Sequence, residues 1–324
     1  MPPLLEIKEL TTVFDTNRGR IRAVDKVSLS LQQGETLAVV GESGCGKTML
    51  ALSIMRLLPP NGSIIKGAVT FQGQDLLKLS SEEMRSKRGG DIAMIFQEPM
   101  TSLNPVIRIG EQIAEAIRLH QKLPAKEAMD LSIEQLREVG IPEPERRARD
   151  YPHQLSGGMR QRVMIAMAMS CHPKLLLADE PTTALDVTIQ AQILELIDEL
   201  KKKNNMTVIL ITHDLGVIAQ TADNVAVMYA GKIVEKAPVD EIFARPLHPY
   251  TIGLIDSLPD GGEGGQRYLK TIAGSVPGLY DLTPGCRFRE RCSWSFDQCA
   301  AVEPELKEIA TGHFAACWKT QQKY

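Results

Sequence analysis

The stretch GESGCGKT (41–48) lies between an apolar run, TLAVV (36–40), and a segment with helical spacing, TMLALSIMRLL (48–58). This order is typical of a phosphate-binding loop that joins a buried strand to the first turn of a helix. A chance glycine-rich turn is the alternative, but it does not explain both flanking segments. The glycines let backbone N–H groups face phosphate oxygens, the lysine reaches the terminal phosphates and the threonine hydroxyl ligates Mg²⁺. The residues predicted to bind a nucleotide here are Gly41, Ser43, Gly44, Cys45, Gly46, Lys47 and Thr48.

Further apolar runs predict the fold class. Short runs separated by longer segments with helical spacing are typical of a parallel sheet covered on both faces, and they occur at DIAMIF (91–96), KLLLA (174–178) and TVILI (207–211). Alternating patterns predict antiparallel strands with one exposed face at LLEIKEL (4–10), VSLSLQ (27–32) and GAVTFQG (67–73). Helix formers dominate residues 108–150, with breaks at Gly140, Pro142 and Pro144. We therefore expect an α/β protein with a helical insertion.

Composition limits the classes of partner. The 324 residues include 37 basic and 40 acidic side chains, and no clustered basic face of the kind that binds nucleic acid is evident. We find neither an uninterrupted apolar stretch of about 18 residues nor a signal peptide. We expect the polypeptide itself to be soluble and cytosolic, and to serve any membrane through partner chains.

Two acidic residues follow a predicted buried strand. Asp179 and Glu180 come directly after Leu175–Ala178. Alone, such a pair would indicate a solvated strand end, but in a chain with a phosphate-binding loop it predicts that Asp179 holds Mg²⁺ through water and that Glu180 polarises the attacking water.

A third motif, LSGGM (155–159), opens a helical segment. Free backbone N–H groups and the positive end of the helix favour an anion there. The alternative is an ordinary helix cap made by Ser156.

Together with Gln97 in FQEP, Asp186 after PTTA and His213 in ITHD, these motifs resemble the ATP-binding cassette (ABC) ATPases over about residues 4–255. The resemblance implies a P-loop NTPase fold with a parallel core sheet, an antiparallel β subdomain and a helical subdomain at about 98–156. It places the ATPase domain at residues 1–258.

The resemblance also implies roles for single residues. Gln97 would sense Mg²⁺ and the attacking water, and His213 would contact the terminal phosphate and orient Glu180. Asp186 would lie in a loop that faces a second ATPase subunit. Phe14 would stack on adenine, although a packed or exposed Phe is the alternative at this position. Catalysis is thus expected from Glu180, His213 and Gln97; Mg²⁺ binding from Thr48, Gln97 and Asp179; and contact with the partner's ATP from Ser156, Gly157 and Gly158.

The segments FQEPMTSLNPVIRIGEQIAEAI (96–117), LHPYT (247–251) and PGCRFRERC (284–292) resemble the ATPase subunits of bacterial dipeptide and oligopeptide importers. This implies an ATP-hydrolysing motor at the cytoplasmic face of the membrane, with two permeases, an external substrate-binding protein and a second ATPase, often a paralogue. An importer of nickel or another small solute from the same branch is an alternative. A soluble cassette ATPase acting on ribosomes or DNA is disfavoured by the single cassette and the lack of heptads. A subunit that binds ATP without hydrolysis is disfavoured by Glu180 and His213.

Four cysteines fall in the predicted C-terminal extension (259–324), which begins with the linker DGGEGG. Disulfides are unfavourable in a cytosolic chain, which leaves metal ligation or free thiols. Four thiolates suit an iron–sulfur cluster as well as zinc. The resemblance to the peptide-importer branch favours a structural 4Fe–4S cluster on Cys286, Cys292, Cys299 and Cys317.

Overall fold

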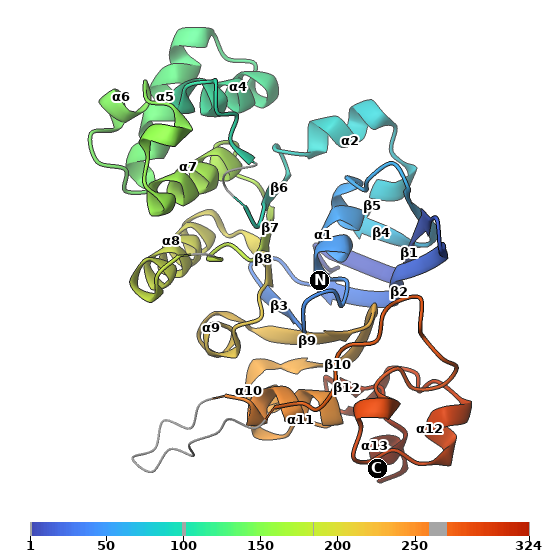
Figure 1. Ribbon diagram of the computed structural model, residues 1–324. Coiled ribbons are helices and arrows are strands. Elements are labelled where there is room, and N and C mark those ends of the chain that lie inside the picture. The colour runs from blue at the N-terminus through green and yellow to red at the C-terminus, as the bar shows by residue number, and fades with distance from the viewer. Residues whose placement is uncertain (1, 99–101, 184, 259–270, 324) are drawn as a thin grey trace, which may run out of the picture.

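The computed structural model describes residues 2–98, 102–183, 185–258 and 271–323. The helical subdomain lies at one end of the molecule, an antiparallel sheet at its side, and the C-terminal segment at the opposite end (Figure 1). The predicted linker and the boundary between residues 258 and 259 fall on or beside residues outside these ranges, as do Pro99–Thr101 of the 96–117 motif.

The antiparallel sheet contains the three strands predicted from alternation. Its order is β2-β1-β4-β5, and the first two strands pair from Leu5 with Leu31 to Thr16 with Gly19. Its strands are β1 (Leu5–Thr16), β2 (Gly19–Leu31), β4 (Gly62–Phe71) and β5 (Gln74–Asp75).

The second sheet has the order β11-β12-β10-β9-β3-β8-β7-β6. The strands from β9 to β6 are parallel and almost wholly buried. Continuous apolar runs predict four of them, β3, β6, β7 and β8, whereas β9 was not predicted. They are β3 (Thr36–Val40), β6 (Ile92–Ile95), β7 (Leu175–Asp179), β8 (Thr207–Ile211) and β9 (Asn224–Tyr229).

Three antiparallel strands extend the parallel core that the sequence predicts, so the sheet as a whole is mixed. The antiparallel part comprises β10 (Lys232–Pro238), β11 (Lys307–Ala310) and β12 (His313–Ala315). A tight turn at Ala230 and Gly231, both with positive φ, reverses the chain between β9 and β10. The C-terminal segment then adds β12 beside β10, so it extends the core sheet.

Helices cover the sheets and build the helical subdomain. In α4 the residues Ile109, Ile113 and Ile117 recur at a spacing of four and are fully buried. Gly140 has a φ of +73° and follows the end of α5, as its place in the sequence predicts. The helices are α1 (Lys47–Met55), α2 (Ser81–Lys87), α4 (Ile109–Gln121), α5 (Ala125–Glu138), α6 (Pro144–Arg147), α7 (Gly157–Met169), α8 (Val187–Asn204), α9 (Leu215–Thr221), α10 (Val239–Ala244), α11 (Pro249–Asp256), α12 (Asp297–Ala301) and α13 (Trp318–Lys323). Within the described ranges, no helix has the length and apolar character needed to cross a membrane.

Candidate functional site

The loop after β3 packs so tightly at Gly41 and Gly46 that neither position has room for a side chain. A Cβ added to Gly41 would lie 2.1 Å from the carbonyl oxygen of Met228, and one added to Gly46 would lie 2.2 Å from that of Ala23. Gly46 also has a φ of +108° and directly precedes α1. No side chain caps the start of α1, so backbone N–H groups of its first turn can bind an anion.

Lys47 is buried and lies across this loop. Its Nζ donates hydrogen bonds to the carbonyl oxygens of Gly41, at 2.7 Å, and Glu42, at 3.2 Å. The ammonium group is thus held where phosphate oxygens would meet the loop.

Asp179, at the end of β7, provides a cation site beside the loop. Burial raises the pKa of its carboxyl, and a hydrogen bond with Thr48 partly offsets that effect. Oδ1 is buried without a hydrogen-bond partner among the described residues. An unsatisfied buried carboxylate oxygen beside a threonine hydroxyl fits Mg²⁺ or one of its water ligands.

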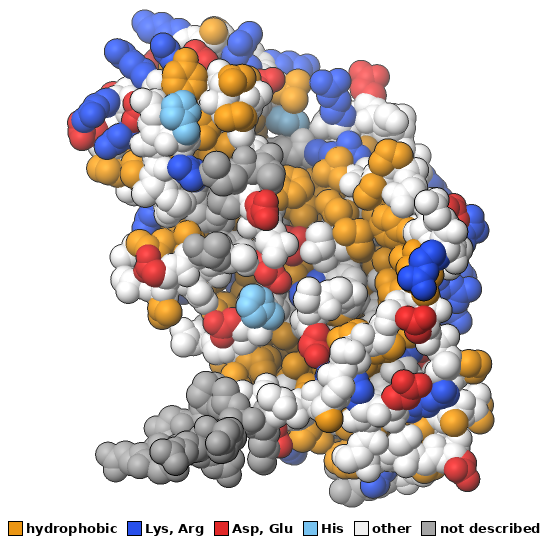
Figure 2. Space-filling view, viewed as in Figure 1, with side chains coloured by type: hydrophobic (Ala, Val, Ile, Leu, Met, Phe, Trp, Pro, Cys, Tyr) orange, Lys and Arg blue, Asp and Glu red, His pale blue; other side chains and the backbone are white. Residues whose placement is uncertain are grey.

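Glu180 follows in a left-handed backbone conformation with a φ of +46°. Its Oε2 accepts hydrogen bonds from Nε2 of Gln97, at 3.0 Å, and from the Thr183 hydroxyl, at 2.9 Å. Nδ1 of His213 lies 3.4 Å from Oε1, and the His213 side chain is 68% exposed. The structure thus brings three predicted catalytic residues together. Acidic side chains and a histidine gather on the middle of this face, between the helical subdomain and the antiparallel sheet (Figure 2).

The motif LSGGM begins α7. The Ser156 hydroxyl accepts a hydrogen bond of 3.3 Å from the Met159 backbone, so Ser156 does cap the helix. A Cβ on Gly157 would meet only Leu185, at 3.8 Å, whereas one on Gly158 would lie 3.0 Å from Ile189. Gly157 therefore has more free space beside its backbone than Gly158.

Asp186 caps the next helix on this side of the core. Its Oδ1 accepts a hydrogen bond of 3.0 Å from the Ile189 backbone at the start of α8. The cap stabilises the helix end, and a role toward a second subunit stays a prediction.

Comparison with known proteins identifies the family. Residues 24–183 match the family described as "ABC transporter", and residues 234–299 match "Oligopeptide/dipeptide transporter, C-terminal region". The dipeptide transport ATP-binding protein DppD of Haemophilus influenzae is 51% identical over 95% of this chain and 93% of its own length. The chain belongs to the dipeptide/oligopeptide import family of ABC transporter ATPases.

Other proteins similar to this ABC ATPase agree. The oligopeptide transport ATP-binding protein OppD of Bacillus subtilis is 50% identical over 97% of this chain and 88% of its own length. Among solved structures, the ATP-binding cassette MJ0796, described as a dimer in a post-hydrolysis state bound to ADP and Pi, has a TM-score of 0.66 at 26% identity. That match covers 72% of this chain and 98% of MJ0796. The ABC fold and ATP binding by this domain are therefore established.

Phe14 of this ABC ATPase lies in β1 and is only 9% exposed. Its ring packs over Gly62, where an added Cβ would lie 2.7 Å from Cε1. Stacking on adenine stays a prediction, because most of the ring surface is already covered by protein.

The four C-terminal cysteines line one small cavity together with His248 and aromatic side chains. The Cys286 backbone donates a hydrogen bond of 2.7 Å to the Cys299 carbonyl, and the Trp294 backbone donates one of 3.3 Å to Sγ of Cys292. Burial, with smaller contributions from the other cysteines, raises the pKa of Cys286 to about 11. No disulfide links them, and in the described part of the chain no three His, Cys, Asp or Glu side chains form a group able to hold a single metal ion.

Two functional contacts were missed by the sequence analysis. The Thr183 bond to Glu180 comes from PTTA, a motif used only to locate Asp186. The buried amide of Gln161 on α7 donates a hydrogen bond of 2.5 Å to the Pro181 carbonyl. It therefore links the LSGGM helix to the loop after Glu180. The segment RQR (160–162) after LSGGM was the available signal.

Proposed function

We propose that this chain is the ATP-hydrolysing motor of a bacterial importer for dipeptides or oligopeptides. The supporting observation is Glu180, whose carboxylate is held beside Asp179 by Gln97 and Thr183. The names of the relatives DppD and OppD support the substrate class.

In this proposal the phosphate-binding loop holds ATP through the backbone of Gly41, Ser43, Gly44, Cys45 and Gly46 and through Lys47. Thr48, Asp179 and Gln97 would hold Mg²⁺, and the chemistry that the ion would supply there is neutralisation of negative charge on the phosphates.

Glu180 accepts a proton from the attacking water, or polarises it, during hydrolysis. Gln97 and Thr183 keep the carboxylate in one orientation, since both donate to Oε2. The exposed His213 ring is free to meet the terminal phosphate on the other side of Glu180.

We propose that two ATPase subunits share each ATP. Ser156, Gly157 and Gly158 of one subunit would complete the site of the other, because the start of α7 offers free N–H groups to the phosphates. Asp186 would face the partner subunit, which we expect to be a paralogue. ATP would favour the closed dimer, and hydrolysis of ATP would let the dimer reopen.

The remaining partners are two permeases and an external substrate-binding protein, and nucleic acid is not expected. The ATPase domain (1–258) would dock on the permeases at the cytoplasmic face of the membrane through its helical subdomain (98–156). The C-terminal extension (259–324) would stay on the ATPase.

Reconstitution tests the function. The chain, its second ATPase, both permeases and the binding protein are placed in vesicles, and ATP hydrolysis is measured with a dipeptide, an oligopeptide or nickel outside. We expect peptide to stimulate hydrolysis in wild type and not in Glu180→Gln. Stimulation by nickel alone would favour the small-solute importer. A rate of ATP hydrolysis that does not change with permeases or substrate would favour a soluble ATPase.

We further propose that Cys286, Cys292, Cys299 and Cys317 hold a 4Fe–4S cluster with a structural role. The chemistry of the side chains supports this, because four thiols, which are the ligands of such a cluster, line one cavity with His248 and no carboxylate. Zinc is the alternative, and its four thiolates would converge to about 2.3 Å from one ion. The iron, sulfide and zinc content of anaerobically purified protein distinguishes these alternatives. Four irons and four sulfides per chain would support the cluster, and one zinc or no metal per chain would contradict it.

A further inference from the structure

The C-terminal extension reaches the ATP site through an ion pair between Arg291 and Glu42. Nη1 and Nη2 of Arg291 donate to the two carboxylate oxygens at 2.7 and 3.1 Å. This two-point contact is the strongest geometry available to an arginine and a carboxylate. Arg291 directly precedes Cys292, whereas Glu42 is the second residue of the phosphate-binding loop.

The guanidinium of Arg291 is fixed on all sides. Its side chain is only 5% exposed, and Nε donates to the carbonyl oxygen of Ala273 at 2.9 Å. The rings of Tyr229 and Phe288 lie 5.8 and 5.9 Å from it. Burial acts to lower the pKa of Arg291, but the hydrogen bonds to Glu42 and Tyr229 outweigh it and raise the pKa above its usual value. The positive charge is therefore permanent.

Glu42 is engaged through all its polar groups. Its backbone N–H donates to the Tyr250 hydroxyl at 2.8 Å, and its carbonyl accepts from Lys47 at 3.2 Å. Its carboxylate stands in a loop built to bind phosphates. Without a counter-charge, that carboxylate would repel a bound triphosphate, because like charges in a partly buried site are weakly screened.

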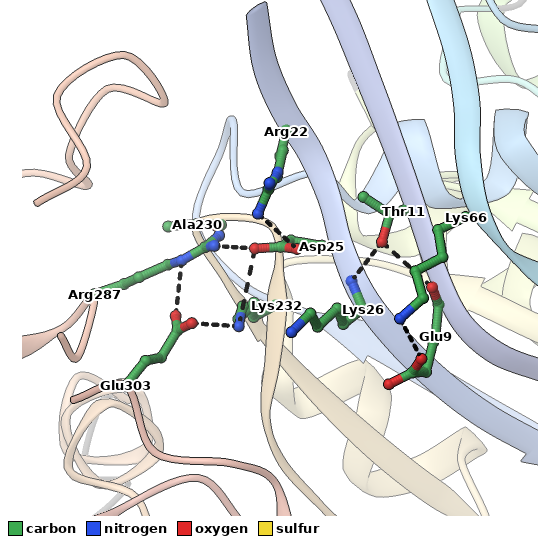
Figure 3. Close-up of polar contacts among 10 residues, drawn as sticks. All are labelled: Glu9, Thr11, Arg22, Asp25, Lys26, Lys66, Ala230, Lys232, Arg287 and Glu303. Atoms are coloured by element: carbon green, nitrogen blue, oxygen red, sulfur yellow. Dashed lines mark hydrogen bonds and ion pairs between the residues drawn. The ribbon is translucent and has the colours of Figure 1, made fainter. Parts of the chain in front are cut away.

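A second arginine of the same segment approaches the loop by another route. Arg287, directly after Cys286, donates to Asp25, to the Ala230 carbonyl and, at 3.0 Å, to Glu303, and Lys232 joins this network (Figure 3). Gly231, which follows Ala230 in the chain, donates its N–H to the Cys45 carbonyl at 2.7 Å. The segment PGCRFRERC thus contacts the ATP-binding loop directly through Arg291 and is linked to it indirectly through Arg287 and the turn at Ala230 and Gly231.

We propose that Arg291 is a positioning residue for ATP: it neutralises Glu42 and fixes the phosphate-binding loop, so that the C-terminal extension sets the affinity for ATP. The inference rests on ATP binding and not on the identity of the transported solute. It gives the extension a function at the ATP site beyond closing the cysteine cavity.

The test is equilibrium binding of the non-hydrolysable analogue adenylyl imidodiphosphate with Mg²⁺ to the full-length chain. We expect Arg291→Gln to raise Kd by about tenfold or more, as loss of one charge pair near the ligand implies. The matched control is Arg289→Gln in the same segment. Among the described residues, Arg289 donates to Thr283, Pro284 and Ala300, all within the extension, and its variant should bind within about twofold of wild type.

A double variant separates positioning from folding. Adding Glu42→Gln to Arg291→Gln removes the unpaired carboxylate, and should return Kd to within about threefold of wild type. If Arg291→Gln does not fold, Arg291→Lys replaces it as the test, because lysine keeps the charge but loses the two-point contact. Its Kd should exceed the wild-type Kd and should rise further with added salt. Wild-type affinity in Arg291→Gln, or a double variant no better than the single one, would overturn the proposal. A wild-type chain that binds no nucleotide would instead overturn the ATP-site assignment beneath it.

Discussion

The amide of Gln97 donates a hydrogen bond of 3.0 Å to the Glu180 carboxylate and so joins the segment after β6 to the end of β7. The Thr183 hydroxyl binds the same oxygen, at 2.9 Å. The other carboxylate oxygen of Glu180, Oε1, lies 3.4 Å from Nδ1 of His213. One carboxylate oxygen is used for orientation and the other is available for chemistry.

Thr183→Val tests this orientation. The change is nearly isosteric and removes only the hydroxyl that donates to Glu180, so we expect kcat for ATP hydrolysis to fall by roughly tenfold with little change in KM. The matched control is Thr182→Val, one residue earlier, which should keep wild-type kcat. Equal kcat in the two variants would contradict the role of Thr183.

Asp179→Asn should separate stability from function. Since burial raises the pKa of Asp179, its charged form is disfavoured in the folded protein, and stability is lost as pH rises through that raised pKa. Without Mg²⁺, the variant should melt about 2 °C or more above wild type at pH 7.5. The difference in melting temperature between the variant and wild type should become smaller as the pH falls toward about 3.9, the usual pKa of an Asp carboxyl.

The same variant should lose the extra stability that Mg-ATP gives wild type, because the ion loses a negative partner. Thermal melts without Mg-ATP measure the gain in stability, and melts with Mg-ATP measure the lost stabilisation by the ligand. Full stabilisation of Asp179→Asn by Mg-ATP would exclude Asp179 from the magnesium site.

Gly157→Asp tests the shared ATP site. The backbone there has room for a side chain, and an acidic residue in the first turn of α7 suits the helix dipole, so the chain should fold normally. The isolated subunit should bind ATP as wild type does. In the assembled transporter, the new charge would face the partner's phosphates, and hydrolysis should fall by about a hundredfold. Wild-type hydrolysis in the assembly would place ATP away from Gly157.

The nucleotide loop could be predicted from sequence because its chemistry is local. A strand, three glycines, Lys47 and a helix must follow one another directly, and the structure has them in that order. The parallel strands were equally visible, since each is a short apolar run buried on both faces.

Contacts between distant segments could not be predicted. Glu42 and Arg291 are 249 residues apart, and neither position carries a pattern that identifies its partner. The same holds for the pairing of β12 with β10, because β12 has three residues and no alternation long enough to read. The sequence therefore predicted the parallel core but not the antiparallel strand β12 that extends it.

The rate of ATP hydrolysis by Glu180→Gln in the assembled transporter measures the central role assigned to this chain. The amide keeps the shape of the side chain but cannot take a proton from water. We expect hydrolysis to fall by about a hundredfold or more, with ATP still bound and retained in the closed dimer. Hydrolysis at the wild-type rate would contradict the assignment of Glu180 as the catalytic carboxylate.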